Sequence, residues 1–225
     1  MKRETLDQLL LDREAKRAVV LATHLESGDE RLIYADAEAD GVLEAAAASA
    51  LRSDRAGPFE ADGKNYFLNV FNPPLRMLLV GAVHIAQPLS AMAALAGFEV
   101  TVIDPRSAFA SEERFPQVEI QHEWPDEALK ALAPDARTAI VTLTHDPKLD
   151  DPALQIAVRS EAFYIGSLGS KRTHAARLER LREAGFGEDE GKRICGPVGL
   201  SIGAKSPAEI AASILAQIIQ TLRSG

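Results

Sequence analysis

From Leu75 onward, short apolar runs rich in valine and isoleucine alternate with segments of helical character, and this alternation restricts the fold more than any other feature. The runs are four or five residues long and carry no charge, which is typical of strands covered on both faces of a parallel sheet. Strands that alternate with helices build an open α/β sheet. We therefore predict a Rossmann-like, doubly wound parallel sheet, with strands at Met77–Val80, Val100–Ile103, Ala139–Leu143 and Ala162–Ile165.

The residues before this region have the pattern of a small α+β domain. Leucines at helical spacing in residues 6–10 and the alanine-rich segment Val42–Leu51 favour helices. Pro73-Pro74 cannot continue a sheet ladder, so we place a boundary there and predict domains at residues 1–74 and 75–225. The predicted strands are Arg17–Leu25, Arg31–Tyr34 and Lys64–Phe71, with a hairpin turn at Asp62-Gly63 and a solvated turn at Glu38-Ala39-Asp40.

Composition excludes several classes of protein. The chain has 25 lysines and arginines against 33 aspartates and glutamates, a formal net charge of −8, which argues against a nucleic-acid partner because a phosphate backbone calls for a basic face. Cys195 is the single cysteine, so neither an intramolecular disulfide nor a Cys-rich zinc site can form. The uncharged stretch Met77–Phe98 is interrupted by Gly81 and Pro88, so we expect no membrane span. The first ten residues lack the apolar core of a signal peptide, and we expect a cytoplasmic protein.

The turn after the first predicted strand of the α/β region resembles a damaged dinucleotide fingerprint. Gly81 supplies the tight turn, but Val83 stands where a second glycine would let the backbone approach a pyrophosphate. Asp104 follows the next strand at about the distance expected of a ribose-binding carboxylate, and Arg106 could meet a phosphate. His84 is a ligand contact or a turn histidine. An NAD(P)-dependent oxidoreductase is therefore one hypothesis, and a Rossmann-like domain that has lost tight NAD binding is the simpler alternative.

Two further loops follow predicted strands. The first loop contains glycine and serine and ends in two basic residues where a helix is predicted to begin. Backbone amides, the helix N-terminus and the two cations can therefore face one anion. The alternative is a flexible loop followed by a solvated, basic helix start. The second loop, Thr144–Asp146, contains His145, which Asp146 could orient to bind a cofactor or move a proton. The alternative is that this segment holds only a helix cap and a loop histidine. Asp151, which precedes Pro152, also suits a helix cap. The candidate anion-binding residues are Gly166, Ser167, Gly169, Ser170, Lys171 and Arg172.

The last predicted helix opens with the capping box Ser206-Pro207-Ala208-Glu209. Between Ile210 and Leu222 it carries no charge, so we expect wide burial, in the core or against a second copy of the chain. A homo-oligomer, most simply a two-fold dimer, would follow from this burial.

Five separated segments carry familiar motifs in order along the chain: Gly81–Gln87, Val102–Arg106, Thr144–Asp146, Tyr164–Arg172 and Gly196–Pro207. Together these segments resemble the motifs of the XdhC/CoxI family, accessory proteins for molybdenum hydroxylases. Two departures are visible: Val83 stands where the family usually shows glycine, and Gln217 where it often shows glutamate.

The resemblance implies a maturation chaperone more than an enzyme. Such a protein binds the molybdenum cofactor, as molybdopterin or its dinucleotide form, assists its sulfuration and hands it to the apo-enzyme of a xanthine dehydrogenase or carbon monoxide dehydrogenase, with a cysteine desulfurase as a further partner. Residues 1–74 would then be a divergent N-terminal region of the family. Cys195 could carry sulfur, but a lone cysteine is more often a small buried hydrophobe. The catalytic candidates are His145 and Asp146. The cofactor-binding candidates are Gly81, His84, Asp104, Arg106, Gly166, Ser167, Gly169, Ser170, Lys171 and Arg172.

Overall fold

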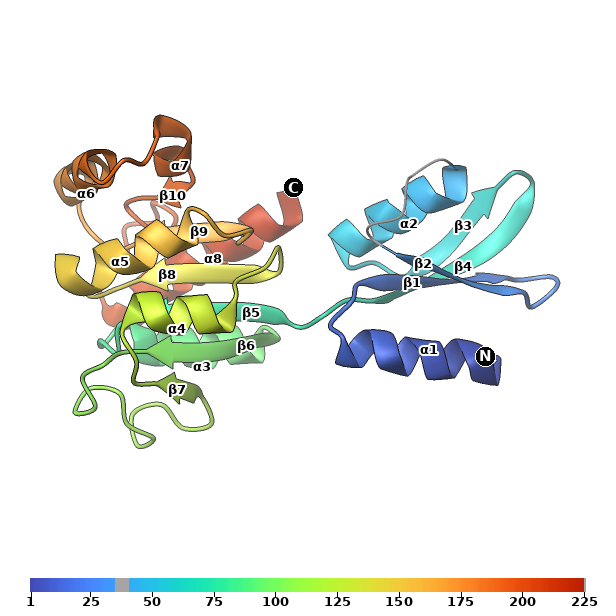
Figure 1. Cartoon of the computed structure of the whole chain (residues 1–225), viewed down its shortest axis with the longest axis horizontal. Helices are drawn as coiled ribbons and strands as arrows, with labels where there is room; N and C mark the ends of the chain where they lie inside the picture. Colours follow the sequence, from blue (N-terminus) through green and yellow to red (C-terminus); the bar gives the residue numbers. More distant parts are fainter. Residues whose placement is uncertain (35–40, 225) are drawn as a thin grey trace. The chain divides into compact units, whose positions relative to one another are not determined.

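The computed structural model describes residues 1–34 and 41–224, which form two compact units, Met1–Pro73 and Pro74–Gly225 (Figure 1). The turn predicted at Glu38-Ala39-Asp40 lies outside the described residues. Each unit has its own sheet and its own buried core.

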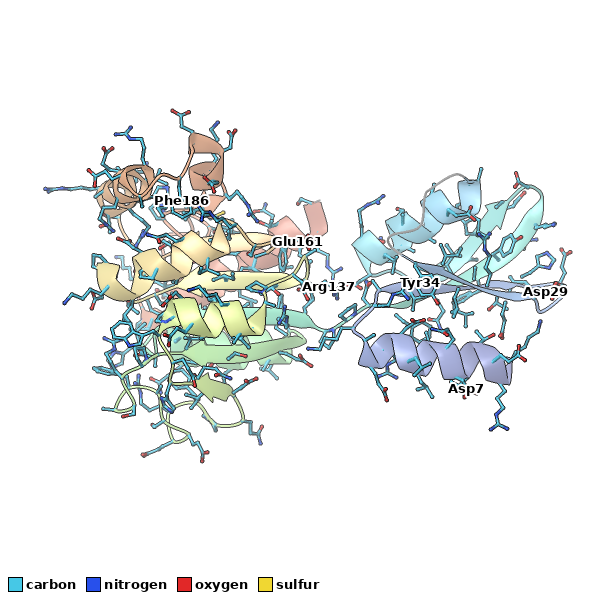
Figure 2. All side chains as sticks on the ribbon, in the orientation of Figure 1. Asp7, Asp29, Tyr34, Arg137, Glu161 and Phe186 are labelled. Carbon is cyan, nitrogen blue, oxygen red and sulfur yellow. The ribbon has the colours of Figure 1, made fainter. Side chains whose placement is uncertain are left out.

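The first unit is a four-stranded antiparallel sheet with a helix on each face (Figure 1). Asp62 and Gly63 have positive φ values of 50° and 71° and form the predicted hairpin turn. Helix α2 covers one face through Ala47 and Leu51. On α1, Asp12 accepts a hydrogen bond from the Tyr34 hydroxyl at 3.0 Å; Tyr34 is labelled in Figure 2. In sheet order the strands are β2 (Glu30–Tyr34), β1 (Val19–His24), β4 (Lys64–Phe71) and β3 (Gly57–Ala61), and the helices are α1 (Arg3–Glu14) and α2 (Val42–Ser53).

The second unit is built on a six-stranded, wholly parallel sheet. Its first strand in the chain lies in the middle, and the strands then follow outward on one side and afterwards on the other. This is the Rossmann strand order, and it confirms the predicted fold class. From edge to edge the strands are β7 (Glu119–Gln121), β6 (Phe98–Ile103), β5 (Leu75–Val80), β8 (Thr138–Thr142), β9 (Tyr164–Ser167) and β10 (Ile194–Cys195).

Alternate side chains of the central strands point to opposite faces of the sheet and pack in two separate hydrophobic cores. Met77 and Leu79 of β5 pack in the core that contains residues of α3 and α8, whereas Leu78 and Val80 pack with residues of α4, α5 and α6. Because both faces are covered, these strands need an apolar residue at nearly every position, which explains the uncharged runs Met77–Val80 and Val100–Ile103 within β5 and β6. The helices are α3 (Ala86–Leu95), α4 (Pro125–Leu132), α5 (Pro147–Ala157), α6 (Lys171–Glu183), α7 (Glu188–Lys192) and α8 (Pro207–Ser224).

Helix α8 begins as predicted but is buried on one face only. Ser206 Oγ accepts from the Glu209 amide at 3.3 Å, and Glu209 accepts from the Ser206 amide at 2.9 Å, which completes the capping box. Ile214 and Ile218 are buried in the core that includes α3, whereas Ile219 is 38% exposed. Lack of charge therefore does not mean burial all round in this helix. Among the helices of residues 1–34 and 41–224, none has both the length and the apolar character needed to cross a membrane.

Candidate functional site at the carboxyl edge of the parallel sheet

The residues predicted to bind or react follow the carboxyl ends of four neighbouring strands. Gly81 follows β5, Asp104 follows β6, Thr144 comes soon after β8, and Ser167 is the last residue of β9. Parallel strands end at one edge of a sheet, and open α/β sheets bind ligands at that edge, where the strand order reverses. In this sheet the reversal falls between β5 and β8.

Gly81 sets the spacing between two of these loops. Its φ is +108°, and its amide donates to Ile103 O at 2.8 Å. A Cβ at this position would lie 2.3 Å from Thr144 Cγ2, so a side chain here would force the turn after β5 away from the turn after β8. His84, also predicted to contact a ligand, is exposed in the turn before α3.

The carboxylate of Asp104 is directed into the protein. It is fully buried, and its Oδ2 accepts from the Ala82 amide at 2.8 Å. Arg106 donates to the same carboxylate from Nε at 2.8 Å and from Nη2 at 2.7 Å. Burial acts to raise the pKa of Asp104, but the hydrogen bonds from Arg106 and Ala82 outweigh it and hold the pKa below its usual value. Both carboxylate oxygens of Asp104 therefore already accept hydrogen bonds within the protein, whereas a ribose-binding carboxylate needs an oxygen that faces the ligand.

Arg106 presents the cation of this pair. Its side chain is 39% exposed, and the hydrogen bond to Asp104 raises its pKa, with smaller contributions from the charges of Asp146 and Asp150.

The Thr144–Asp146 turn holds His145 in an uncommon conformation. The residue is exposed and has φ +65°, in the left-handed region that few non-glycine residues adopt. Asp146 is the N-cap of α5, and its side chain accepts from the Lys148 amide at 3.0 Å. The prediction that Asp151 caps a helix is wrong: Asp151 lies inside α5 and accepts from Arg180 Nη2 at 2.9 Å. The cap lies five residues earlier because Asp146 precedes Pro147, which suits the first helical position equally well.

The sequence reasoning missed a buried ion pair behind the turn. Asp150 is 1% exposed and Arg177 is 2% exposed, with Nη2 and Oδ2 3.4 Å apart. Burial raises the pKa of Asp150 and lowers that of Arg177, because both groups are removed from water. A usable signal was present: Asp150 is four residues before the buried Leu154, and Arg177 four before the buried Leu181, which places each charge on the apolar stripe of its helix.

The loop after β9 leads directly into the first turn of α6. Ser167 is buried, with its hydroxyl 2.5 Å from that of Thr142. Ser170 is the N-cap of α6 and accepts from the Thr173 amide at 3.1 Å. Lys171 and Arg172 follow as the first helical residues; both are exposed, and no acidic residue stands in this first turn. Gly166 is buried against Val198 and Tyr164, and Gly169 has φ +148°.

The basic pair at the start of α6 opposes the usual charge preference of helices. The N-terminal end of a helix dipole is positive and favours acidic side chains. Two cations at that end cost stability unless an anion joins them. The charges of the first turn of α6 therefore depart from the usual helix preference.

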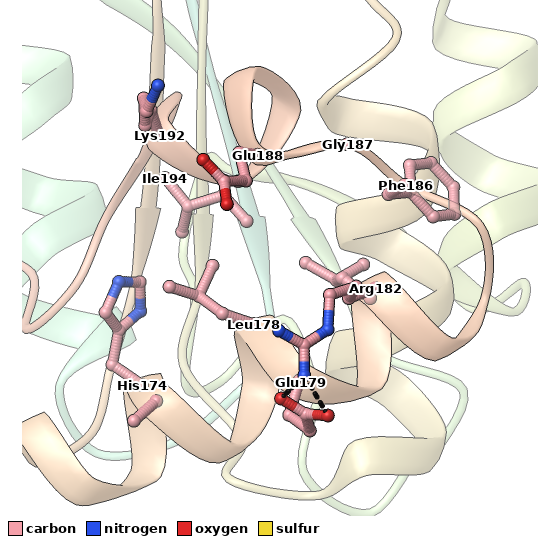
Figure 3. A pocket seen from close by; sticks show the side chains of 12 residues that line it. His174, Leu178, Glu179, Arg182, Phe186, Gly187, Glu188, Lys192 and Ile194 are labelled. Atoms are coloured by element: carbon pink, nitrogen blue, oxygen red, sulfur yellow. Dashed lines mark hydrogen bonds and ion pairs between the residues drawn. The ribbon is translucent and has the colours of Figure 1, made fainter.

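A pocket of about 600 Å³ lies along α6, between it and the segment from α7 to β10 (Figure 3). Leu178, Phe186 and Ile194 form its apolar wall, and an ion pair between Arg182 and Glu179 stands at its border. His174, one turn after the N-cap of α6, is the first residue along the chain that lines this pocket. Among the described residues that line it, none is a predicted site residue.

The strand order of the second unit defines a Rossmann-type α/β domain. The sequence matches the XdhC Rossmann domain over residues 77–218, and the chain belongs to the XdhC family.

Individual relatives agree with this family. The chain is 32% identical over 148 residues to the molybdenum cofactor insertion chaperone PaoD of Escherichia coli (66% of this chain, 40% of that protein). It is 35% identical over 158 residues to a probable xanthine dehydrogenase subunit of Bacillus subtilis (70% and 46%). A crystal structure of a xanthine dehydrogenase from Bacillus halodurans matches with a TM-score of 0.71 and 26% identity, over 99% of this chain and 65% of that chain. The chain thus spans less than half the length of these two curated relatives.

Proposed function

We propose that this chain binds the molybdenum cofactor and helps to insert it into a molybdenum hydroxylase of the xanthine dehydrogenase or carbon monoxide dehydrogenase type. Two relatives support the proposal: one is named a molybdenum cofactor insertion chaperone and the other a probable xanthine dehydrogenase subunit. The cofactor would bring the molybdenum centre that the client enzyme uses.

The observation that carries the proposal is the cationic start of α6. The cofactor is a pterin that ends in a phosphate, or in a pyrophosphate in its dinucleotide form, so it needs an anion receptor. Lys171 and Arg172 are the first two residues of α6, so their charges lie at the positive end of a helix dipole, a combination that suits a phosphate. Gly166, Ser167, Gly169 and Ser170 would shape the loop around that phosphate.

Residues of the neighbouring loops would receive the rest of the ligand. Arg106 supplies a further exposed cation, and Gly81 keeps the turn after β5 close to Thr144. His84 and His145 are both exposed, and His145 would hold or release a proton beside the cofactor while the chain assists its sulfuration. The carboxylate of Asp146 already accepts from Lys148, so its part is to fix the turn that carries His145. A cysteine desulfurase would be the source of sulfur.

An NAD(P)-dependent oxidoreductase is the second candidate, and the Rossmann strand order favours it. Two features weigh against it. Val83 replaces the glycine next to which a pyrophosphate would lie, and Asp104 is paired with Ala82 and Arg106 instead of standing free for a ribose. These features support the maturation role over hydride transfer.

Two organisational proposals accompany the function. Residues 1–74 are a divergent form of the family's N-terminal region, joined to the cofactor-binding domain at residues 75–225. The exposed, uncharged side of α8, which includes Ile219, would support a homodimer, and sedimentation equilibrium would measure the number of chains in the assembly.

The decisive experiment is cofactor binding by the purified chain. We expect the wild type to bind molybdopterin or its dinucleotide form, and Lys171→Ala and Arg172→Ala each to weaken binding roughly ten- to hundredfold, because a charge-assisted hydrogen bond contributes about 1.5–3 kcal/mol. Arg182→Ala, an exposed cation in the last turn of the same helix, should leave affinity unchanged. Absence of binding, or equal affinity in all four proteins, would refute the proposal. Tight NAD or NADP binding that Asp104→Ala abolishes would favour the oxidoreductase.

A further inference from the structure

We propose that Asp150 and Arg177 are positioning residues that hold the Thr144–Asp146 turn and the loop Gly166–Ser170 in one fixed arrangement. The proposal goes deeper into the proposed function, because the first turn of α6 that this arrangement presents is the suggested phosphate receptor. Neither residue is expected to touch the ligand.

Asp150 organises the first of the two segments. Its Oδ1 accepts from the Thr144 hydroxyl at 2.6 Å and from the Thr144 amide at 3.3 Å. Its Oδ2 accepts from the His145 amide at 3.1 Å. Three donors of one turn therefore meet a single carboxylate, and the left-handed backbone of His145 persists because the surrounding contacts fix it.

Arg177 links that carboxylate to the second segment. Its Nη2 lies 3.4 Å from Asp150 Oδ2 and donates to Leu168 O at 3.1 Å. Leu168 in turn donates its amide to Thr142 O at 2.8 Å. One nitrogen thus joins the turn after β8 to the loop after β9, a few residues before Lys171.

The pair is poorly suited to a purely stabilising role. Nε and Nη1 of Arg177 are buried and have no hydrogen-bond partner among the described residues, so the guanidinium is removed from water without full compensation. A buried ion pair of this kind contributes little net stability, and apolar residues of similar volume often replace it without loss. What apolar residues cannot supply is the set of hydrogen bonds to Thr144, His145 and Leu168.

The neighbouring residues provide a matched control. Asp151 and Arg180 form a second ion pair between the same two helices, with an Nη2–Oδ1 distance of 2.9 Å. Within residues 1–34 and 41–224, the side chains of this pair make no hydrogen bond to either loop, and Arg180 is 37% exposed. The pair therefore tests what a helix-to-helix ion pair does without the loop contacts.

The experiment compares two double variants of the full chain, Asp150→Leu/Arg177→Met and Asp151→Leu/Arg180→Met. In the first, no charge is left alone in the core, so we expect a folded protein whose loss of stability is limited to the Thr144 and His145 donors that Asp150 no longer accepts. Amide hydrogen exchange should nevertheless become at least tenfold faster at Thr144, His145 and Leu168, with the amides of β8 unchanged. The control double variant should exchange like the wild type at all of these positions.

The single variants Asp150→Leu and Arg177→Met extend the comparison. Each leaves one buried charge without its partner, so each should be less stable than the double variant. Only the exchange rates of the loop amides distinguish a positioning role from a role in stability. Wild-type exchange at Thr144, His145 and Leu168 in a folded Asp150→Leu/Arg177→Met protein would overturn the proposal, as would equally fast exchange in the control.

A binding arm separates this inference from the proposed function. With inorganic phosphate as the probe, the wild type should show a Kd that rises at least tenfold in Asp150→Leu/Arg177→Met but not in the control. If phosphate fails to bind the wild type, the phosphate receptor on α6 is refuted, whereas the exchange data still decide whether the pair positions the loops.

Discussion

Replacement of Gly81 by alanine should destabilise the second unit through two separate effects. An L-residue at φ +108° costs about 1–2 kcal/mol in backbone strain. The added Cβ would lie 2.3 Å from Thr144 Cγ2, and relief of such an overlap in a packed site costs about 1–3 kcal/mol. The expected loss in the free energy of unfolding is therefore about 2–5 kcal/mol for Gly81→Ala.

Two companion variants separate the effects. Gly97 has φ +89° with no atom within 4 Å of an added Cβ, so Gly97→Ala should cost only the backbone strain, about 1–2 kcal/mol. Thr144→Ser removes the opposing methyl group and keeps the hydroxyl that bonds Asp150. In the background of Gly81→Ala it should recover most of the overlap cost.

Urea unfolding followed by the fluorescence of Trp124, the single tryptophan of the chain and a residue of the second unit, measures all four proteins. The reasoning fails if Gly81→Ala costs no more than Gly97→Ala. It also fails if Thr144→Ser restores nothing, since the close approach of the two turns would then be absent.

Three further expectations concern caps, charge and a buried amide. Asp146→Ala should lower the free energy of unfolding by about 0.5–2 kcal/mol, the usual cost of losing an N-cap, as measured in urea, and an unchanged stability would contradict the cap. The pKa of Asp104 is lower in the folded than in the unfolded protein, so its contribution to folding stability is fully present above the unfolded pKa. That contribution is lost as the pH falls from about 4 through the lower folded pKa. Thermal stability measured against pH should therefore fall less steeply below pH ~4 in Asp104→Asn than in the wild type, and identical pH dependences in the two proteins would argue against the pairing. Gln217 Oε1 accepts from the Tyr164 hydroxyl at 2.6 Å and from the Gly199 amide at 2.8 Å, so Gln217→Leu should cost about 1–3 kcal/mol per orphaned donor, whereas Gln217→Glu keeps both acceptor contacts and should cost less in the same urea assay.

The central strands were predictable from the sequence because burial on both faces requires runs of consecutive apolar residues. The predicted runs Met77–Val80 and Val100–Ile103 lie within β5 and β6. The edge strands β7 and β10 have only three and two residues, too few for any periodic pattern. In the first unit, β3 contains Pro58 and lies at a sheet edge, where proline is tolerated but hides the strand from sequence reasoning.

The position of the site followed from topology, but its internal pairing did not. Once the strands are parallel, the loops with His145 and Lys171 must lie at one edge. Whether Asp104 faces a ligand or the protein depends on the orientation of its side chain, which no spacing rule determines. Arg177 was missed because an arginine among arginines on an amphipathic helix has the composition of a solvated face; its spacing of four residues from the buried Leu181 indicates instead the burial that the structure shows.

The central place of β5 has a consequence for how the chain acquires its shape. The strand that follows the first unit directly is also the one on which both halves of the parallel sheet grow, β6 to one side and β8 to the other. Pairing with β6 closes a short crossover through α3, whereas pairing with β8 must wait until some sixty residues have been made, at a larger loop-closure entropy. On a ribosome, β5, α3 and β6 would therefore assemble first, and the edge that carries His145 and Lys171 would be completed last.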